Sequence, residues 1–223
     1  FTLDVDAFIQ TVNQNDASLA VICNPNNPTG GVLPLEAIEY IAERISCAFL
    51  IDEAYAEFSE HSVFQLLKKY PHMMIARTFS KAYALASCRV GYMLAHGDVI
   101  EMIAKTYMPY HMNVLSLVTA DTVFQMRSEF EPQIQMICAE RERMREQYER
   151  LAGVTVYPSH TNFILLHYPH ADELNEEFIQ CGIGVRSFGK APQLANMLRI
   201  SIGRPDENDA VYRVMKSFLE GNP

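Results

Sequence analysis

The sequence lacks any hydrophobic run long enough to cross a bilayer, which takes about 20 consecutive apolar residues. Its apolar runs, such as Ala48 to Ile51, cover only a few residues each. The chain has 223 residues, of which 49% are hydrophobic and 20% charged, so it can bury a sizeable core. We therefore expect a globular protein of the cytoplasm that has no membrane partner.

Basic residues are also scarce. The chain has 18 Lys and Arg residues against 27 Asp and Glu, which gives a formal net charge of -9. A surface that binds nucleic acid needs clustered Lys and Arg on one face. The composition argues against a nucleic-acid partner, and any basic residue in a functional site must act locally.

Several motifs that carry chemistry are absent as well. No C-x-x-C or H-E-x-x-H pattern occurs, so neither a metal site nor a disulfide framework is expected. No G-x-G-x-x-G follows a strand pattern, which disfavours an NAD-dependent enzyme, and no G-x-S-x-G marks a serine hydrolase. The five cysteines are scattered and are expected to be incidental thiols: Cys23, Cys47, Cys88, Cys138 and Cys181.

What is present in the first half is an alternation of short apolar runs and helical patterns. A helical pattern starts after Pro34 and runs from Leu35 to Ile45. Apolar strands that alternate with helices indicate an α/β layer with a mainly parallel sheet. We predict that residues 1–113 belong to this larger domain, with strands at Leu19 to Cys23, Ala48 to Ile51, Met73 to Ala76 and Val90 to Ala95.

The second half has a different character. Residues 114–151 read as a long helical connecting segment, in which Pro132 is expected to break or kink the helix. Residues 152–223 are then predicted to form a small α+β domain. Its expected strands lie at 154–157, 162–167, 184–187 and 197–202, and its expected helices at 171–182 and 206–219.

Polar stretches follow three of the predicted strands. These are the turn-rich stretch from Asn24 to Gly30, the stretch from Asp52 to Tyr55, and the stretch from Thr78 to Lys81. In an open α/β sheet, ligands bind at the carboxyl ends of the strands. A cofactor with a basic ring nitrogen, a ring hydroxyl, an aldehyde and a phosphate would use all three stretches.

Four motifs carry a resemblance to a known family. NPNNPTG, IDEAYAEF, TFSKAYALASCRVGY and MLRISIG occur in this order. They resemble the pyridoxal-phosphate (PLP) aminotransferases of fold type I, and within them the histidinol-phosphate aminotransferase branch. The resemblance implies the PLP-dependent transferase fold type I, with a mainly parallel sheet in the large domain and a small C-terminal α+β domain. It also implies PLP as the cofactor and a homodimer.

The resemblance also implies roles for residues around the cofactor ring. Lys81 would form a Schiff base with the PLP aldehyde and afterwards move a proton between substrate and cofactor. Asp52 would face the ring nitrogen and keep it protonated. Asn27 and Tyr55 would donate hydrogen bonds to the ring oxygen.

Further residues would bind anionic groups in this family. Thr78, Ser80 and Arg89 would hold the cofactor phosphate, because a guanidinium binds a phosphate with two parallel hydrogen bonds. Arg199 would bind the anionic group of the substrate, and Arg186 would help to hold a substrate phosphate.

The function implied is amino transfer from histidinol phosphate to a 2-oxo acid, 2-oxoglutarate, in histidine biosynthesis. Threonine-phosphate decarboxylase, a lyase, shares these motifs and is the alternative enzyme. A third reading is an inactive module that binds a ligand or dimerises, because the family's amino-terminal part, which supplies a phosphate cradle and a ring stacked on PLP, is expected to be missing. Ser87 and Cys88 replace a more usual glycine and leucine, with little effect expected.

Overall fold

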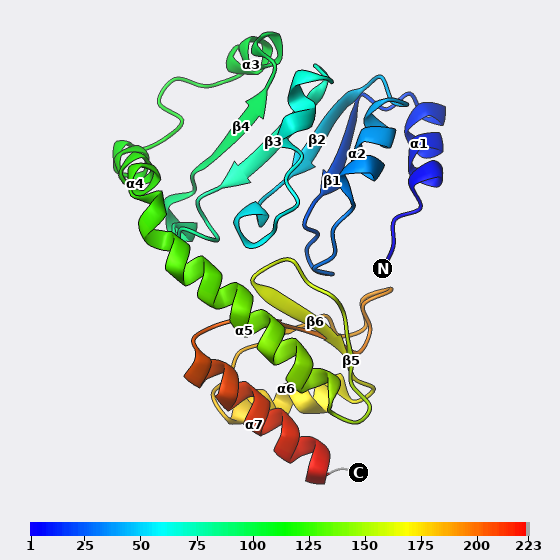
Figure 1. Cartoon of the computed structure of the whole chain (residues 1–223), viewed down its shortest axis with the longest axis vertical. Helices are drawn as coiled ribbons and strands as arrows, with labels where there is room; N and C mark the ends of the chain where they lie inside the picture. The colour runs from blue at the N-terminus through cyan, green and yellow to red at the C-terminus, as the bar shows by residue number, and fades with distance from the viewer. Residues whose placement is uncertain (222–223) are drawn as a thin grey trace. The chain divides into compact units, whose positions relative to one another are not determined.

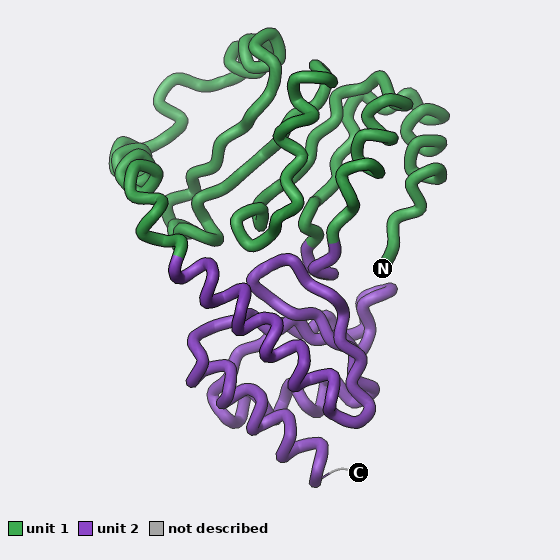
Figure 2. Tube along the Cα trace, viewed as in Figure 1, with its two compact units in different colours: residues 1–26, 32–131 green, residues 27–31, 132–223 purple. Residues whose placement is uncertain are grey.

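The computed structural model describes residues 1–221, and these form two compact units (Figure 2). Unit 1 comprises residues 1–26 and 32–131. Unit 2 comprises residues 27–31 and the residues from 132 onward. The short segment 27–31 therefore leaves the unit that surrounds it in the sequence and packs with the second one.

Unit 1 is built on a four-stranded sheet with the order β1-β2-β3-β4 (Figure 1). The first three strands are parallel, and β4 runs antiparallel to β3. The predicted α/β class with a mainly parallel sheet is therefore confirmed. The strands are β1 (Leu19–Cys23), β2 (Ala48–Asp52), β3 (Met73–Thr78) and β4 (Gly91–Ala95).

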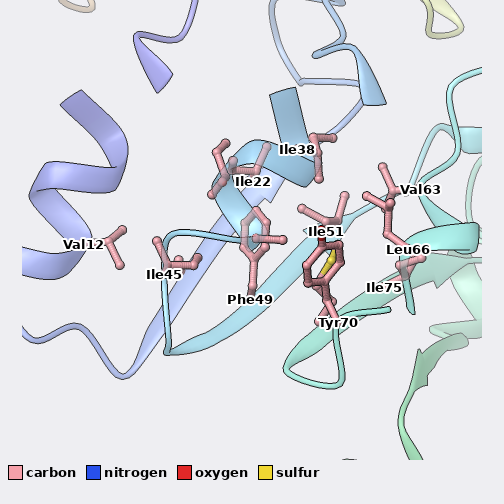
Figure 3. Close-up of a cluster of buried hydrophobic side chains, with 14 residues drawn as sticks. Val12, Ile22, Ile38, Ile45, Phe49, Ile51, Val63, Leu66, Tyr70 and Ile75 are labelled. Carbon is pink, nitrogen blue, oxygen red and sulfur yellow. The ribbon is translucent and has the colours of Figure 1, made fainter. Parts of the chain in front are cut away.

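One face of this sheet is covered by the main core of unit 1. Alternate side chains of β1 to β3 pack there against helices α1 (Val5–Gln14) and α2 (Leu35–Ala42) and against the 3-10 helix η2 (Phe64–Lys68), as Figure 3 shows. Asp4 begins α1 as its N-cap, because its carboxylate accepts a hydrogen bond from the Ala7 amide at 2.9 Å. Phe49, Ile51 and Ile75 are fully buried in this core.

The other face of the sheet is more open at its edge. Leu19 and Val21 alternate along β1 with the buried Ala20 and Ile22, and they remain 50% and 48% exposed. Since successive side chains of a strand point to opposite faces, β1 has one buried face and one apolar face that is half exposed.

The rest of unit 1 consists of helices and short turns after β2, β3 and β4. A small cluster of Phe79, Val90 and Ala120 joins the segment after β3 to α4. The elements are η1 (Ala56–Phe58), η3 (Ala86–Cys88), α3 (Gly97–Ala104), α4 (Val114–Gln125) and η4 (Arg127–Phe130).

The break in the helical stretch from Val114 onward differs from the prediction. We expected it at Pro132, but α4 ends at its C-cap Met126 and α5 (Glu131–Glu149) begins before the proline. Pro132 lies in the first turn of α5, where the backbone N–H that proline lacks has no intrahelical partner in any case. The proline therefore starts a helix rather than breaking one.

Unit 2 contains an antiparallel sheet with the order β5-β6-β8-β7. Helices α5, α6 and α7 pack on it around a core that includes Met144, Tyr148 and Phe178. The bounds are β5 (Thr155–Val156), β6 (Phe163–His167), α6 (Ala171–Gln180), β7 (Arg186–Ser187), β8 (Met197–Ser201) and α7 (Pro205–Gly221). No helix within residues 1–221 is long and apolar enough to span a bilayer.

Candidate active site

Asp52 is the last residue of β2, and its carboxylate is held from two sides. One oxygen, Oδ1, accepts a hydrogen bond from the Ala54 amide at 3.0 Å. The other, Oδ2, lies 3.9 Å from Sγ of Cys23, which is paired with Asp52 in the sheet. Burial, and then the nearby charge of Asp52, raise the pKa of the Cys23 thiol, so the thiol stays neutral beside the carboxylate.

Thr78 and Ser80 form a hydroxyl pair at the end of β3. Oγ1 of Thr78 donates to Oγ of Ser80 at 2.8 Å and accepts a hydrogen bond from the Ser80 amide at 3.0 Å. Both residues are half-buried. Hydroxyls and backbone N–H groups at a strand end are the donors that proteins use to hold a phosphate.

Lys81 directly follows this pair and is exposed. Its Nζ lies 5.5 Å from the ring centroid of the buried Tyr55, which follows β2. The lysine and the phenol ring thus come from the ends of two neighbouring strands. A cation at this distance from an aromatic ring is attracted by the ring's negative face.

Arg89 returns to the same end of β3 through the loop between β3 and β4. The Phe79 amide donates to the carbonyl of Val90 at 3.1 Å, so the residue before Val90 lies beside this strand end. Arg89 is exposed and adopts a left-handed backbone conformation with a φ of 55°, and its Nη1 donates to the carbonyl of Ala86 at 2.9 Å.

Asn27 lies in the segment that belongs to unit 2. Its Oδ1 accepts a hydrogen bond from Nη1 of Arg199 at 2.6 Å. The same segment is fixed at Gly30, which has a φ of 79° and whose carbonyl accepts a hydrogen bond from the His160 amide at 2.8 Å. A Cβ atom at Gly30 would lie 2.7 Å from Oγ of Ser159, so only glycine fits at this close approach.

Arg186 and Arg199 are direct cross-strand neighbours on β7 and β8. Two like charges in this position repel each other unless an anion lies between them. The Arg199 guanidinium carbon lies 4.9 Å from the ring centroid of Phe163. Within the described part of the chain, Nε of Arg199 is a buried donor without an acceptor. The pair is therefore suited to bind an anionic ligand.

The structure gathers the predicted site residues in two groups. Unit 2 holds Asn27, Arg186 and Arg199, joined by the hydrogen bond and the strand pairing above. The roles assigned to all of them stay predictions. Unit 1 holds the remaining six at the ends of β2 and β3: Asp52, Tyr55, Thr78, Ser80, Lys81 and Arg89.

Two further charged residues at these strand ends were missed in the sequence. Glu53 and Arg77 form an ion pair at 2.7 Å, with the Glu53 side chain fully buried. The sequence signal that could have predicted these two residues is their position beside predicted site residues. Glu53 directly follows Asp52, and Arg77 directly precedes Thr78.

Comparison with known proteins identifies the family. A model of the family described as "Aminotransferase class I and II" matches residues 1–214. The chain belongs to this family.

Named relatives agree with this family assignment. The "Histidinol-phosphate aminotransferase 1" of Carboxydothermus hydrogenoformans is 40% identical over 222 residues, which are 98% of this chain and 62% of that protein. The chain thus spans less than two thirds of the length of this aminotransferase relative.

Solved structures also resemble the chain. A histidinol-phosphate aminotransferase from Sinorhizobium meliloti, in complex with pyridoxal-5'-phosphate, has a TM-score of 0.88 and 25% identity, covering 99% of this chain and 62% of that one. An L-threonine-O-3-phosphate decarboxylase from Porphyromonas gingivalis has a TM-score of 0.82 and 26% identity, covering 91% of this chain and 65% of that one.

The donor set of this aminotransferase chain fits PLP. In unit 1 a carboxylate, a phenol, two hydroxyls and an amine lie at neighbouring strand ends, with a guanidinium beside them. These are the groups that a basic ring nitrogen, an aldehyde and a phosphate require.

Proposed function

We propose that the chain acts as a PLP-dependent aminotransferase that moves the amino group of histidinol phosphate to 2-oxoglutarate in histidine biosynthesis. The observation that carries this proposal is the set of donors at the ends of β2 and β3, with Lys81 beside the Tyr55 ring. The relatives named as histidinol-phosphate aminotransferases support the choice of substrate.

The residues of unit 1 have distinct tasks in this proposal. When bound, PLP supplies an aldehyde that reacts with amines and a ring that accepts electrons from the substrate. Lys81 provides the amine for covalent attachment and moves the proton at the substrate carbon. Asp52, with its carboxylate fixed by the Ala54 amide, holds a proton at the ring nitrogen.

In this proposal, hydroxyl groups and arginines bind the anionic groups of the cofactor and the substrate. Thr78, Ser80 and Arg89 hold the cofactor phosphate, and Arg186 and Arg199 hold the phosphate or carboxylate of the substrate. The support for the arginine pair is its cross-strand placement and the buried Nε of Arg199, which has no acceptor in the described residues. In unit 1, Tyr55 binds the ring oxygen.

A homodimer is the second part of this proposal, and the cytoplasm is its expected setting. Unit 1 exposes a stretch of apolar side chains before and along α4, which we name the α4 surface. An exposed apolar patch of this kind marks an interaction site, and a second copy of the chain is the occupant proposed here. The α4 surface consists of Tyr107, Met108, Tyr110, Val114, Leu115 and Val118, each at least 59% exposed.

A second candidate reaction is the decarboxylation of threonine phosphate. It is favoured by the likeness to the P. gingivalis decarboxylase. Carbon dioxide release without need for a 2-oxo acid would support the lyase and contradict the aminotransferase. Failure to form a Schiff base at Lys81 would instead support the third reading, an inactive module that binds a ligand or dimerises.

The experiment that tests the proposal is covalent labelling. The chain is incubated with PLP, reduced with borohydride and digested, and the modified lysine is located by mass spectrometry. We expect the pyridoxyl group on Lys81, its loss in Lys81→Arg, and unchanged labelling in the control Lys105→Arg, which alters another exposed lysine of unit 1. Labelling spread over several surface lysines would contradict the proposal.

A further inference from the structure

An ion pair between the buried Glu53 and the half-buried Arg77 lies directly behind the candidate cofactor site. Glu53 follows the last residue of β2, and its amide donates to the carbonyl of Ala76 at 2.9 Å, which extends the ladder between β2 and β3. Because Asp52 lies opposite Ala76 in the parallel register, the next residues along the two strands, Glu53 and Arg77, lie opposite each other.

Several hydrogen bonds hold the side chains of Glu53 and Arg77 in place. Nε and Nη2 of Arg77 donate to the same oxygen, Oε2 of Glu53, at 3.0 and 2.7 Å. The other oxygen, Oε1, accepts from the Val63 amide at 2.7 Å. Oγ of Ser62 lies 3.1 Å from Glu53 Oε2 and 2.9 Å from Arg77 Nη2. Burial works to lower the pKa of Arg77, but the bonds to Glu53 outweigh it and the pKa is raised, so Arg77 stays charged.

The ion pair and the candidate site occupy opposite faces of the same strand ends. Side chains alternate between the two faces of a strand. Glu53 and Arg77 continue the rows of buried residues on β2 and β3 that form the core in Figure 3. Asp52 and Thr78 therefore point to the other face, and each is the chain neighbour of one member of the pair.

We propose that the Glu53–Arg77 pair is a positioning device, which sets the placement of Asp52 relative to Thr78. It thereby fixes the separation between the carboxylate for the ring nitrogen and the hydroxyl for the phosphate, a role that rests on the proposed function. A buried ion pair contributes little net stability compared with apolar residues of similar volume, whereas its directional bonds restrict geometry. We therefore expect the pair to restrict the positions of Asp52 and Thr78 at the strand ends rather than to raise the stability of unit 1.

The first test measures amide hydrogen exchange in the chain without cofactor. The reporters are the amides of Ala54 and Ser80, which donate to the side chains of Asp52 and Thr78. Arg77→Lys keeps the charge but loses the two-donor fork. We expect exchange at both reporters to rise about tenfold more than elsewhere in unit 1, because local opening is set by local contacts.

The matched control is Ile75→Val, which removes one methylene from a fully buried residue two positions before Arg77 on the same face of β3. It lowers the stability of the core and leaves the ion pair in place, so all slow amides of unit 1 should respond alike. Equal exchange profiles for the two variants would overturn the positioning role. Glu53→Gln is the second variant and should act as Arg77→Lys does if the latter fails to fold.

The second test compares the affinities for PLP and for pyridoxal, which lacks the phosphate. With both strand ends in register, PLP should bind more tightly than pyridoxal, and Arg77→Lys should reduce this ratio about tenfold while Ile75→Val leaves it unchanged. A chain that binds PLP with an unaltered ratio in Arg77→Lys contradicts the positioning role alone. A wild-type chain without labelling at Lys81 contradicts the proposed function, and the exchange experiment then still decides whether the pair positions the two side chains.

Discussion

The two units differ sharply in how much apolar surface they leave exposed. Among the described residues, eighteen large hydrophobic side chains are exposed, and seventeen of them lie in unit 1. Unit 2 contributes only Ile179 to this described set. The two units differ far less in length, so size does not explain the contrast.

The contrast shows that unit 1, although it has a buried core of its own, leaves more apolar surface uncovered than unit 2 does. In unit 2 the sheet packs with α5, α6 and α7 around a cluster in which Met144, Leu174 and Phe178 are fully buried. In unit 1 one face of the sheet is covered, but the outer residues of β1 and the α4 surface remain open. Exposed apolar patches of this kind indicate a surface that another chain or segment covers.

The largest expected effect comes from opening the closed core of unit 2. Phe178→Ala should lower the free energy of unfolding of unit 2 by about 3–5 kcal/mol, because the ring is fully buried and leaves a cavity. Hydrogen exchange of the slow amides in β6 and β8 measures this loss for unit 2 by itself.

The next residue in α6 supplies the matched control. Ile179 is 62% exposed, so Ile179→Ala should change the stability by less than about 0.5 kcal/mol. Similar losses for the two neighbouring positions would mean that unit 2 has no closed core, and the comparison between the units would fail.

A smaller effect is expected on the open surface of unit 1. Leu115→Asp places a charge on the α4 surface, where Leu115 is 76% exposed. If two copies pair through this surface, the substitution should weaken dimerisation by about 2 kcal/mol, or roughly 30-fold in Kd. Sedimentation equilibrium measures the change.

Ile179→Asp is the control for this prediction, because it adds the same charge to the exposed apolar residue of unit 2. The dimerisation constant should then stay at its wild-type value. Equal weakening by both substitutions would point to a general effect of charge and would remove the α4 surface from the proposed interface.

Much of unit 1 could be predicted from the sequence. The parallel strands appear as continuous apolar runs, as in Ala48 to Ile51, although in this sheet only alternate residues are fully buried. The break near Pro132 was placed wrongly, because a proline in a helical pattern is compatible with both the end and the first turn of a helix.

The candidate site could be predicted in part. The strand-end rule led to Asp52 and Thr78 because Asp52 directly follows an apolar run and Thr78 lies two residues after the end of another. The Glu53–Arg77 pair was missed, because its partners meet only through the register of two strands. Residues 27–31 pack with unit 2 through contacts between residues far apart in the sequence, such as the hydrogen bond from the His160 amide to the Gly30 carbonyl, and no local sequence pattern predicts these contacts.

The smallest expected effect concerns backbone strain in the loop of unit 1 between Lys81 and Arg89. Ala84 has a φ of 54°, in the left-handed region that costs a residue with a Cβ about 1–2 kcal/mol. Ala84→Gly removes this cost but adds flexibility to the unfolded chain. The free energy of unfolding of unit 1 should therefore rise by about 0.5–1 kcal/mol. Urea denaturation, monitored through the hydrogen exchange of the β3 amides, measures the rise in the free energy of unfolding.

Asn196 gives the corresponding position in unit 2, with a φ of 60°. Asparagine adopts this conformation with little strain, because its short side chain can hydrogen-bond locally. Asn196→Gly should therefore leave unit 2 unchanged or slightly less stable, as a glycine adds only unfolded-state freedom there. A stabilisation of the same size in both variants would show that the gain at Ala84 reflects the left-handed conformation in general rather than the mismatch of alanine with it.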